Sequence, residues 1–187
     1  MLFTHDTQVA LAAAAALVNT ADGADEHLPD VAALDRFVRA WGWRGDWAHT
    51  GAELRAVRAL RPRLRRLWES TEDQVVEIVN ELLREANALP QLVKHDEWDY
   101  HLHATPTEAP LATRMAVEAA MAFVDVIRSS QLHRLRTCAY PGCGNVLADL
   151  SKNGSKRFCG TGCGNRSAVA AYRARRSAAP PHAVERG

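Results

Sequence analysis

The sequence lacks cysteine in its first 137 residues and lacks any apolar run long enough to cross a bilayer. The longest such run, Val9 to Val18, has ten residues, whereas a membrane-spanning helix needs about 20. No Lys or Arg precedes this run, so it does not have the charge pattern of a secretory signal. These absences predict a cytoplasmic protein with reduced cysteines.

Motifs of the common enzyme classes are missing as well. The sequence has no glycine-rich phosphate loop, no zinc-protease helix motif and no nucleophile-elbow serine motif. The acidic residues between Glu69 and Glu85 fit a solvated helical face. We therefore predict that the protein is not an enzyme. An enzyme with an unrecognised site in the helical region is the less favoured alternative.

Charge is distributed unevenly along the 187 residues. Residues 1–131 hold 13 Lys or Arg against 20 Asp or Glu, whereas residues 132–187 hold 10 against 2. A polyanion would be repelled by the first segment and attracted by the second. The asymmetry predicts nucleic acid as a partner of the C-terminal segment.

Apolar residues recur at helical spacing in five segments before the cysteines, which we expect at about 6–18, 31–41, 50–68, 72–89 and 110–135. Asp30 is expected to cap the second helix, which Gly42 ends, and Thr71 with Gln74 forms a capping box for the fourth. Pro62 is expected to kink or divide the third helix. The fifth helix is expected to lead directly into the cysteines.

Segments 91–95 and 98–103 have the mixed apolar and polar pattern of a β-hairpin. The predicted fold class is therefore mainly α: an N-terminal helical domain with one small β-hairpin, then a small zinc finger with a basic helix. We expect the domains to span residues 1–131 and 132–176, followed by a disordered tail over 177–187.

The four cysteines form two closely spaced pairs. Cys138 and Cys143 have C-x4-C spacing, and Cys159 and Cys163 have C-x3-C spacing after a further 15 residues. Four thiolates on short loops can converge tetrahedrally on one structural Zn²⁺ ion. The glycines around them let the backbone turn tightly, and metal binding would supply about 10 kcal/mol or more of folding free energy. Two disulfides, or a catalytic zinc, are the less favoured alternatives.

The segment from the first to the last cysteine, and the helix after it, resemble the CGNR-type zinc fingers, a family named after the tetrapeptide that stands here at residues 163–166. The resemblance also rests on Asp149, Ser151, Asn153, Arg157, Phe158, Cys159, Tyr172, Arg173, Arg175 and Arg176. The region from Leu17, Val18, Asn19 and Thr20 onward is similar to the helical ABATE domain that accompanies this finger. The resemblance implies a bacterial, stress-induced transcription regulator. The sequence departs from the family pattern at Leu147, where an aromatic is common, and in its run of N-terminal alanines.

Positive charge is dense around the second cysteine pair, because residues 152–176 contain seven Lys or Arg and no acidic residue. We expect Arg166 and Arg173, seven residues apart on one helix face, to lie nearest the bases. The expected phosphate contacts are Lys152, Lys156, Arg157, Arg175 and Arg176. Asn165 either reads adenine or caps the helix.

The sequence thus predicts a regulator that binds double-stranded DNA, in which the helical domain receives a small-molecule effector or partner signal, with a homodimer as the expected form. A zinc-stabilised module for RNA or protein is the alternative. Trp41, Trp43 and Trp47 are interpreted as core or loop cover, with an aromatic ligand site as the other possibility. His95, His101 and His103 are interpreted as ordinary partly exposed residues, with pH sensing or a second metal as the alternatives.

Overall fold

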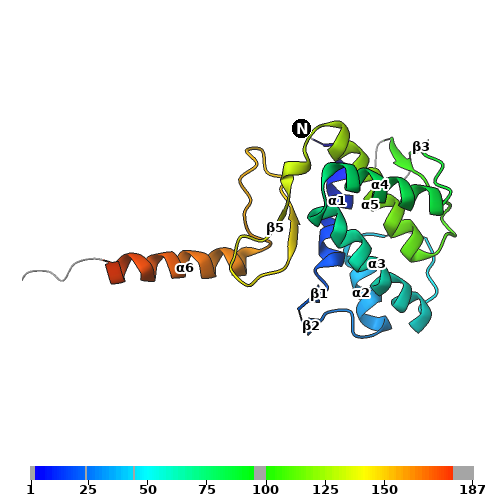
Figure 1. Cartoon of the computed structure of the whole chain (residues 1–187). Coiled ribbons are helices and arrows are strands. Elements are labelled where there is room, and N and C mark those ends of the chain that lie inside the picture. The colour runs from blue at the N-terminus through cyan, green and yellow to red at the C-terminus, as the bar shows by residue number, and fades with distance from the viewer. Residues whose placement is uncertain (1–2, 24, 44, 95–99, 179–187) are drawn as a thin grey trace, which may run out of the picture.

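A computed structural model describes residues 3–23, 25–43, 45–94 and 100–178. Five helices form the body of the molecule: α1 (His5–Val18), α2 (Val31–Ala40), α3 (Gly51–Glu69), α4 (Glu72–Glu85) and α5 (Leu111–Arg128). A sixth helix, α6 (Thr161–Ala178), follows the cysteines and projects away from this body (Figure 1). The predicted mainly α fold class is confirmed. Of the part of the chain that is described, no helix is long and apolar enough to span a membrane.

Among the described residues, three short antiparallel hairpins accompany the helices. They are β1 (Ala21–Asp22) with β2 (Asp25–Glu26), β3 (Gln91–Val93) with β4 (His101–His103), and β5 (Leu135–Thr137) with β6 (Val146–Ala148). The hairpin predicted around residues 91–103 is thus present, with Leu92 opposite Leu102; its expected residues His95 and Trp98 lie outside the described residues. The other two hairpins were not predicted.

Local signals start the helices as expected. The Asp30 carboxylate accepts a hydrogen bond of 2.7 Å from the Ala33 amide, and Gln74 accepts one of 3.0 Å from the Thr71 amide in the predicted capping box. Gly42, with φ +68°, ends α2 as predicted. Both ends of α2 therefore follow from the sequence.

The third helix continues through Pro62, which does not divide it. Proline has no amide hydrogen for the carbonyl four residues earlier, which belongs to Arg58. That carbonyl instead accepts a hydrogen bond of 3.3 Å from Nε of Arg61. A side chain thus takes the place of the missing amide, and α3 runs unbroken over 19 residues.

The fifth helix corrects one expectation, because it does not lead directly into the cysteines. It ends at Arg128, where Ser130 adopts a left-handed φ of +56°. The amides of Ser130 and Gln131 bond back to the carbonyls of Ile127 and Val126, at 2.9 Å each. A short turn, η1 (Leu132–Arg134), then leads into β5.

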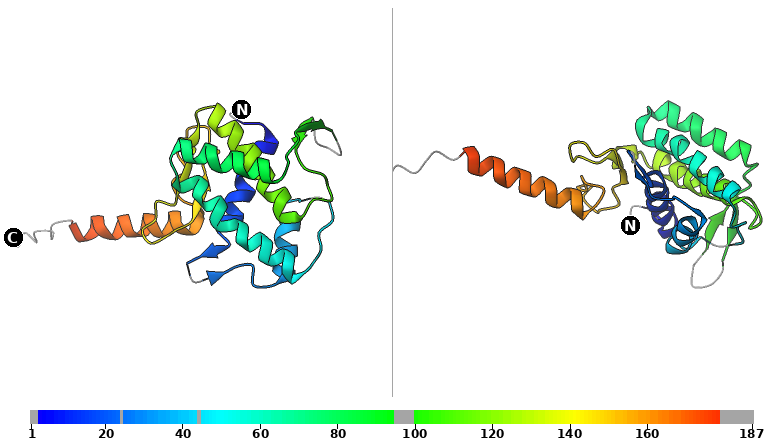
Figure 2. Two further views of the ribbon diagram at one scale, coloured as in Figure 1. Left: turned by 45° about the vertical axis from the view of Figure 1, so that its right-hand side comes forward. Right: turned by 90° about the horizontal axis from the view of Figure 1, so that it is seen from below.

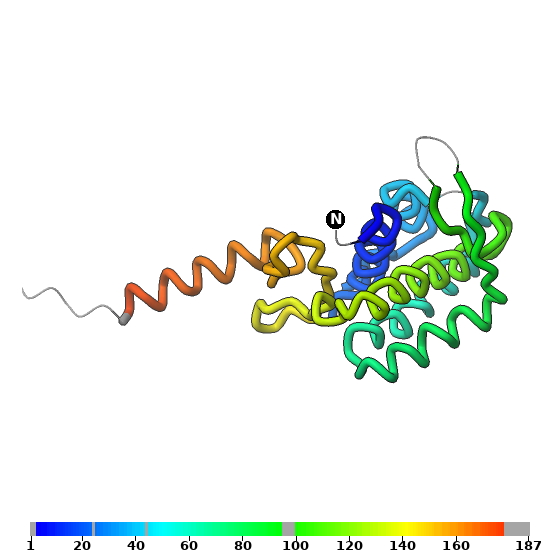
Figure 3. The backbone as a smooth tube through the Cα atoms, turned by 90° about the horizontal axis from the view of Figure 1, so that it is seen from above, coloured from blue at the N-terminus to red at the C-terminus, as the bar shows by residue number. Residues whose placement is uncertain are grey.

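The core lies between α1, α3, α4 and α5, which enclose Phe123 at 0% exposure. The Trp68 ring meets Phe123 edge-on at 5.1 Å between centroids. Buried alanines of α1, Ala13 to Ala15, let its backbone approach its neighbours closely. Figures 2 and 3 show α1 beside α5, with α6 extending away from both.

The hairpin β5–β6 belongs to this core. Val146 and Ala148 are buried among residues of the helices, and β6 lies along α1. The Asn19 side chain, just after α1, bonds both backbone groups of Val146 at 2.8 Å each. On the other side, the Trp68 indole donates a hydrogen bond of 3.0 Å to the Leu147 carbonyl. The first cysteine pair is therefore held against the helical body.

Candidate metal centre and nucleic-acid interface

The four cysteines converge on one point. Cys138 and Cys143 lie in the loop between β5 and β6, Cys159 precedes α6 and Cys163 lies in its first turn. Their Sγ atoms all lie within 4.8 Å of one another. None of the four is in a disulfide, so the disulfide alternative is not supported.

The spacing of the sulfurs fits a tetrahedral metal. The Sγ atoms of Cys143, Cys159 and Cys163 are separated by 3.7 to 3.8 Å. A tetrahedron with metal–sulfur bonds of about 2.3 Å has edges of about 3.8 Å. The four side chains can therefore hold one zinc ion as a closed four-sulfur site, with no coordination position left for a reacting water.

The electrostatics of the cluster favour a cation at its centre. Desolvation, followed by hydrogen bonds with the neighbouring thiols, raises the pKa of Cys159 to about 12. For Cys138 desolvation acts to raise the pKa, but hydrogen bonds from the Cys159 amide, 3.4 Å from Sγ, from the Tyr140 amide and from neighbouring thiols together outweigh it, and the pKa falls to about 7. Four thiolates cannot ionise together at this spacing without a compensating positive charge, and Zn²⁺ would supply it.

Other polar groups of the finger surround the sulfurs. Arg166 lies 3.1 Å from Sγ of Cys163 through Nη2, and its guanidinium stacks on the Tyr140 ring at 4.7 Å. Asn145 reaches Cys159 at 3.8 Å and Asp22 of the body at 3.4 Å. The CGNR arginine thus contacts the metal centre, and Asn145 connects that centre with the β1–β2 hairpin.

A buried carboxylate shapes the loop between the cysteine pairs. Asp149 is fully buried; it accepts hydrogen bonds from the amide and hydroxyl of Ser151 at 3.1 and 2.5 Å and from the Lys156 amide at 2.9 Å. These donors, helped by Arg136, outweigh desolvation and hold the pKa of Asp149 below its ordinary value. Asp149 and Ser151, which the sequence identified through resemblance alone, therefore fix the loop that carries Lys152 and Lys156.

Two arginines of the basic segment serve the fold. Arg134 donates to the carbonyls of Asp149 and Ser151 at 3.1 and 2.7 Å, and Arg136 pairs with Asp149 at 3.7 Å. Sequence reasoning did not single out either residue, because charge alone does not distinguish an internal arginine from an external one.

All the side chains expected to contact DNA are exposed: Lys152, Lys156, Arg157, Asn165, Arg166, Arg173, Arg175 and Arg176. Within the part of the chain that the structure describes, no carboxylate forms an ion pair with any of these cations. Five of the eight lie on α6, which spans Thr161–Ala178. Tyr172 and Val169 are half exposed on the same helix.

Two family models match the chain. The model of the CGNR zinc finger matches residues 134–176. The ABATE model, described as "Putative stress-induced transcription regulator", matches residues 11–130 and so covers well over half of the chain. No curated protein matches the sequence.

Proposed function

The chain belongs to the ABATE family and carries a CGNR zinc finger, and from this premise we propose that it regulates transcription by binding double-stranded DNA through α6 and the loop before it. The observation that carries the proposal is the projection of α6, with Arg173, Arg175 and Arg176 exposed, away from an acidic body (Figure 2). Unpaired surface cations on a projecting helix attract phosphate and leave a groove accessible.

One zinc ion, held by Cys138, Cys143, Cys159 and Cys163, has a structural role in this proposal. Cys163 lies in the first turn of α6, so the metal fixes where the helix starts and in which direction it points. In this proposal the protein binds DNA, is not an enzyme and is located in the cytoplasm.

The eight exposed side chains have different tasks. Arg173 is proposed to lie nearest the bases. Arg166 shares its helix face, but its contact with Cys163 holds it close to the metal, so we expect it to contribute less sequence discrimination than Arg173. Asn165 lies one turn into the same helix. Lys152, Lys156, Arg157, Arg175 and Arg176 are proposed to hold phosphates, as their exposure allows.

The helical region is proposed to receive the signal. We divide the chain into residues 1–131, which bind an effector or partner, and residues 132–176, which bind DNA, with a homodimer as the form that would read a two-fold operator. The packing of β6 on α1 supports this coupling, because a shift of α1 would move the first cysteine pair. A ligand that binds one arrangement of α1 and β6 more tightly than another would shift the population toward that arrangement, and so change the affinity for DNA.

The test is binding of the zinc-loaded protein to a pool of genomic duplex fragments, followed by anisotropy across a salt series. Contact with about five phosphates predicts a log–log slope near −4.5. Arg173→Ala should weaken binding while one zinc per chain is retained, whereas the exposed Arg84 on α4 provides the control Arg84→Ala. Preference for single-stranded RNA, or equal effects of the two substitutions, would refute the proposal.

A further inference from the structure

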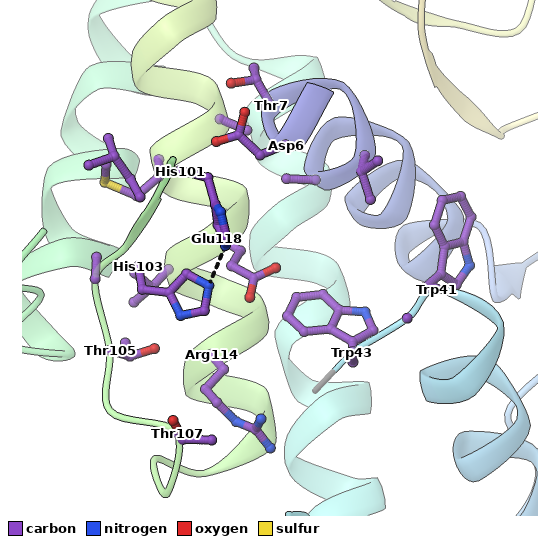
Figure 4. A pocket seen from close by; sticks show the side chains of 18 of the residues that line it. Asp6, Thr7, Trp41, Trp43, His101, His103, Thr105, Thr107, Arg114 and Glu118 are labelled. Atoms are coloured by element: carbon purple, nitrogen blue, oxygen red, sulfur yellow. Dashed lines mark hydrogen bonds between the residues drawn. The ribbon is translucent and has the colours of Figure 1, made fainter. Parts of the chain in front are cut away.

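A cavity of about 270 Å³ lies on the body, far along α1 from the finger. Its walls come from the start of α1, the turn after α2, strand β4 and the middle of α5 (Figure 4). The volume is somewhat below the roughly 300–1,000 Å³ of typical ligand pockets. The cavity therefore suits a small molecule and not a peptide or a nucleic acid.

One wall of the cavity carries a carboxylate. Glu118 of α5 lines the cavity, and its side chain is accessible to solvent. Desolvation raises its pKa to about 7, although Arg114 acts in the opposite direction. Figure 4 shows Glu118 between His103 and Trp43. A cation placed in the cavity would restore the favourable surroundings that this carboxylate loses on folding.

The same wall also carries a positive charge, that of Arg114, which binds groups of the protein itself. Arg114 of α5 is buried and donates a hydrogen bond of 2.6 Å to the Asp46 carbonyl, and its guanidinium packs beside Thr107 and Gly45. Among the lining residues that the structure describes, it is the only permanent cation. Asp6 and Asp125 add two further carboxylates to the lining.

Aromatic rings complete the cavity. The indoles of Trp41 and Trp43 line it, and Nε1 of Trp43 is buried with no hydrogen-bond partner among the described residues. His101 and His103 face each other with their Nε2 atoms 3.0 Å apart. One of these nitrogens must accept the hydrogen bond that the other donates.

We propose that this cavity binds a small organic cation with an apolar body, such as an aralkyl amine or quaternary ammonium, with Glu118 as its counter-ion and the two indoles as its aromatic walls. Cations are attracted to the faces of tryptophan rings, and most strongly where water is excluded. In the function proposed above, this cavity would be the site of the effector. The regulatory effect of the ligand rests on that proposed function, whereas the binding of the ligand does not.

Helix α1 connects the cavity with the finger. Asp6, Thr7, Val9 and Ala10 at the start of α1 line the cavity. Its other end, about 20 Å away at helical rise, is followed by Asn19, which holds β6. A ligand that changes the position of α1 would therefore act on the strand that follows the first cysteine pair.

The experiment measures binding of benzyltrimethylammonium to the zinc-loaded full chain by calorimetry at pH 8, without DNA. Neopentylbenzene, in which carbon replaces the nitrogen, is the neutral isostere, and phenylacetate is the anionic control. We expect the cation to bind at least about tenfold more tightly than either. Glu118→Gln should abolish that preference, whereas Glu77→Gln, at an exposed position of α4, should preserve it.

Equal binding of the cation and its isostere, tighter binding of phenylacetate, no binding of the cation, or an unchanged preference in Glu118→Gln would overturn the proposal. Because this assay contains no DNA, a finger that fails to bind DNA leaves its outcome intact. Conversely, DNA binding by a chain that ignores the cation would preserve the proposed function and refute only the ligand class.

Discussion

At the scale of single residues, two asparagines connect the metal centre with the helical body. Asn19 pairs with both backbone groups of Val146, as a neighbouring strand would, and Asn145 contacts Asp22 and Cys159. Neither contact leaves a pattern in the sequence, because an asparagine after a helix is also an ordinary end signal. In the sequence, Asn19 stands out only as part of a family resemblance.

Replacement of Asn19 by alanine should destabilise the protein by about 1–3 kcal/mol, because it leaves the amide and carbonyl of Val146 without partners in a part-buried place. Chemical denaturation of the zinc-loaded protein measures the change. The control is Asn80→Ala at an exposed position of α4, where a change within about 0.5 kcal/mol is expected. Equal losses in the two variants would contradict the proposed role of Asn19.

At the scale of elements, α6 differs from the five helices of the body. Those helices bury an apolar stripe against one another, whereas residues 165–177 of α6 are almost all exposed. An isolated helix of this length is marginal in water, so its start must be fixed from outside. The metal at Cys163, in the first turn, provides that fixed start.

Proline at Ala170, in the middle of α6, should break the helix at a cost of about 3 kcal/mol while all four cysteines stay in place. We expect one zinc per chain, lower helical circular dichroism, and DNA affinity reduced at least tenfold. Glycine at the same position costs only about 1 kcal/mol and should reduce affinity far less. Unchanged DNA binding in the proline variant would show that α6 is not the contacting element.

The sequence predicted elements where the local signal was strong. Asp30 and Gly42 marked both ends of α2, and the cysteine spacing predicted a single four-sulfur cluster. The end of α5 was missed because Ser130, and not a glycine, adopts the left-handed conformation there. The hairpin β5–β6 was missed because the pairing of its strands depends on packing against α1.

Parts of the candidate site were equally beyond the sequence. Arg134 and Arg173 belong to the same basic segment, so their charge alone does not distinguish them. Only the fold shows that Arg173 is exposed, whereas Arg134 bonds backbone carbonyls of the finger. The cavity was also out of reach, because Trp43, His103 and Glu118 come from three separate segments. Helical periodicity identifies the buried face of α5 but gives no sign that Glu118 borders empty space.

At the scale of the whole molecule, stability should depend on the charge state of Glu118. Below its ordinary pKa of 4.5 both folded and unfolded chains hold the proton. Between 4.5 and about 7 the unfolded chain ionises while the folded chain resists ionisation, so folding loses stability as the pH rises through this window and the loss is complete above it.

Glu118→Gln removes this penalty, so the variant should gain stability over the native protein from pH 5 to pH 8. We expect a gain of about 1 kcal/mol, less than the pKa shift alone would give, because water in the cavity screens the charge. Denaturant unfolding at the two pH values measures it, with Glu77→Gln as the control. A difference that is constant across the window would contradict the assignment.

The burial of β6 in the body determines how this protein can be recombined. A finger cut out at the boundary between the two matched families takes Val146 and Ala148 with it and opens the core that they fill. A chimera that joins this ABATE region to a foreign finger must therefore supply a strand of matching shape against α1, together with backbone groups that Asn19 can bond. The same contact constrains evolution. A mutation in β6 or in α1 limits which residues the other element can accept, so the ABATE region and the finger are expected to evolve as one unit.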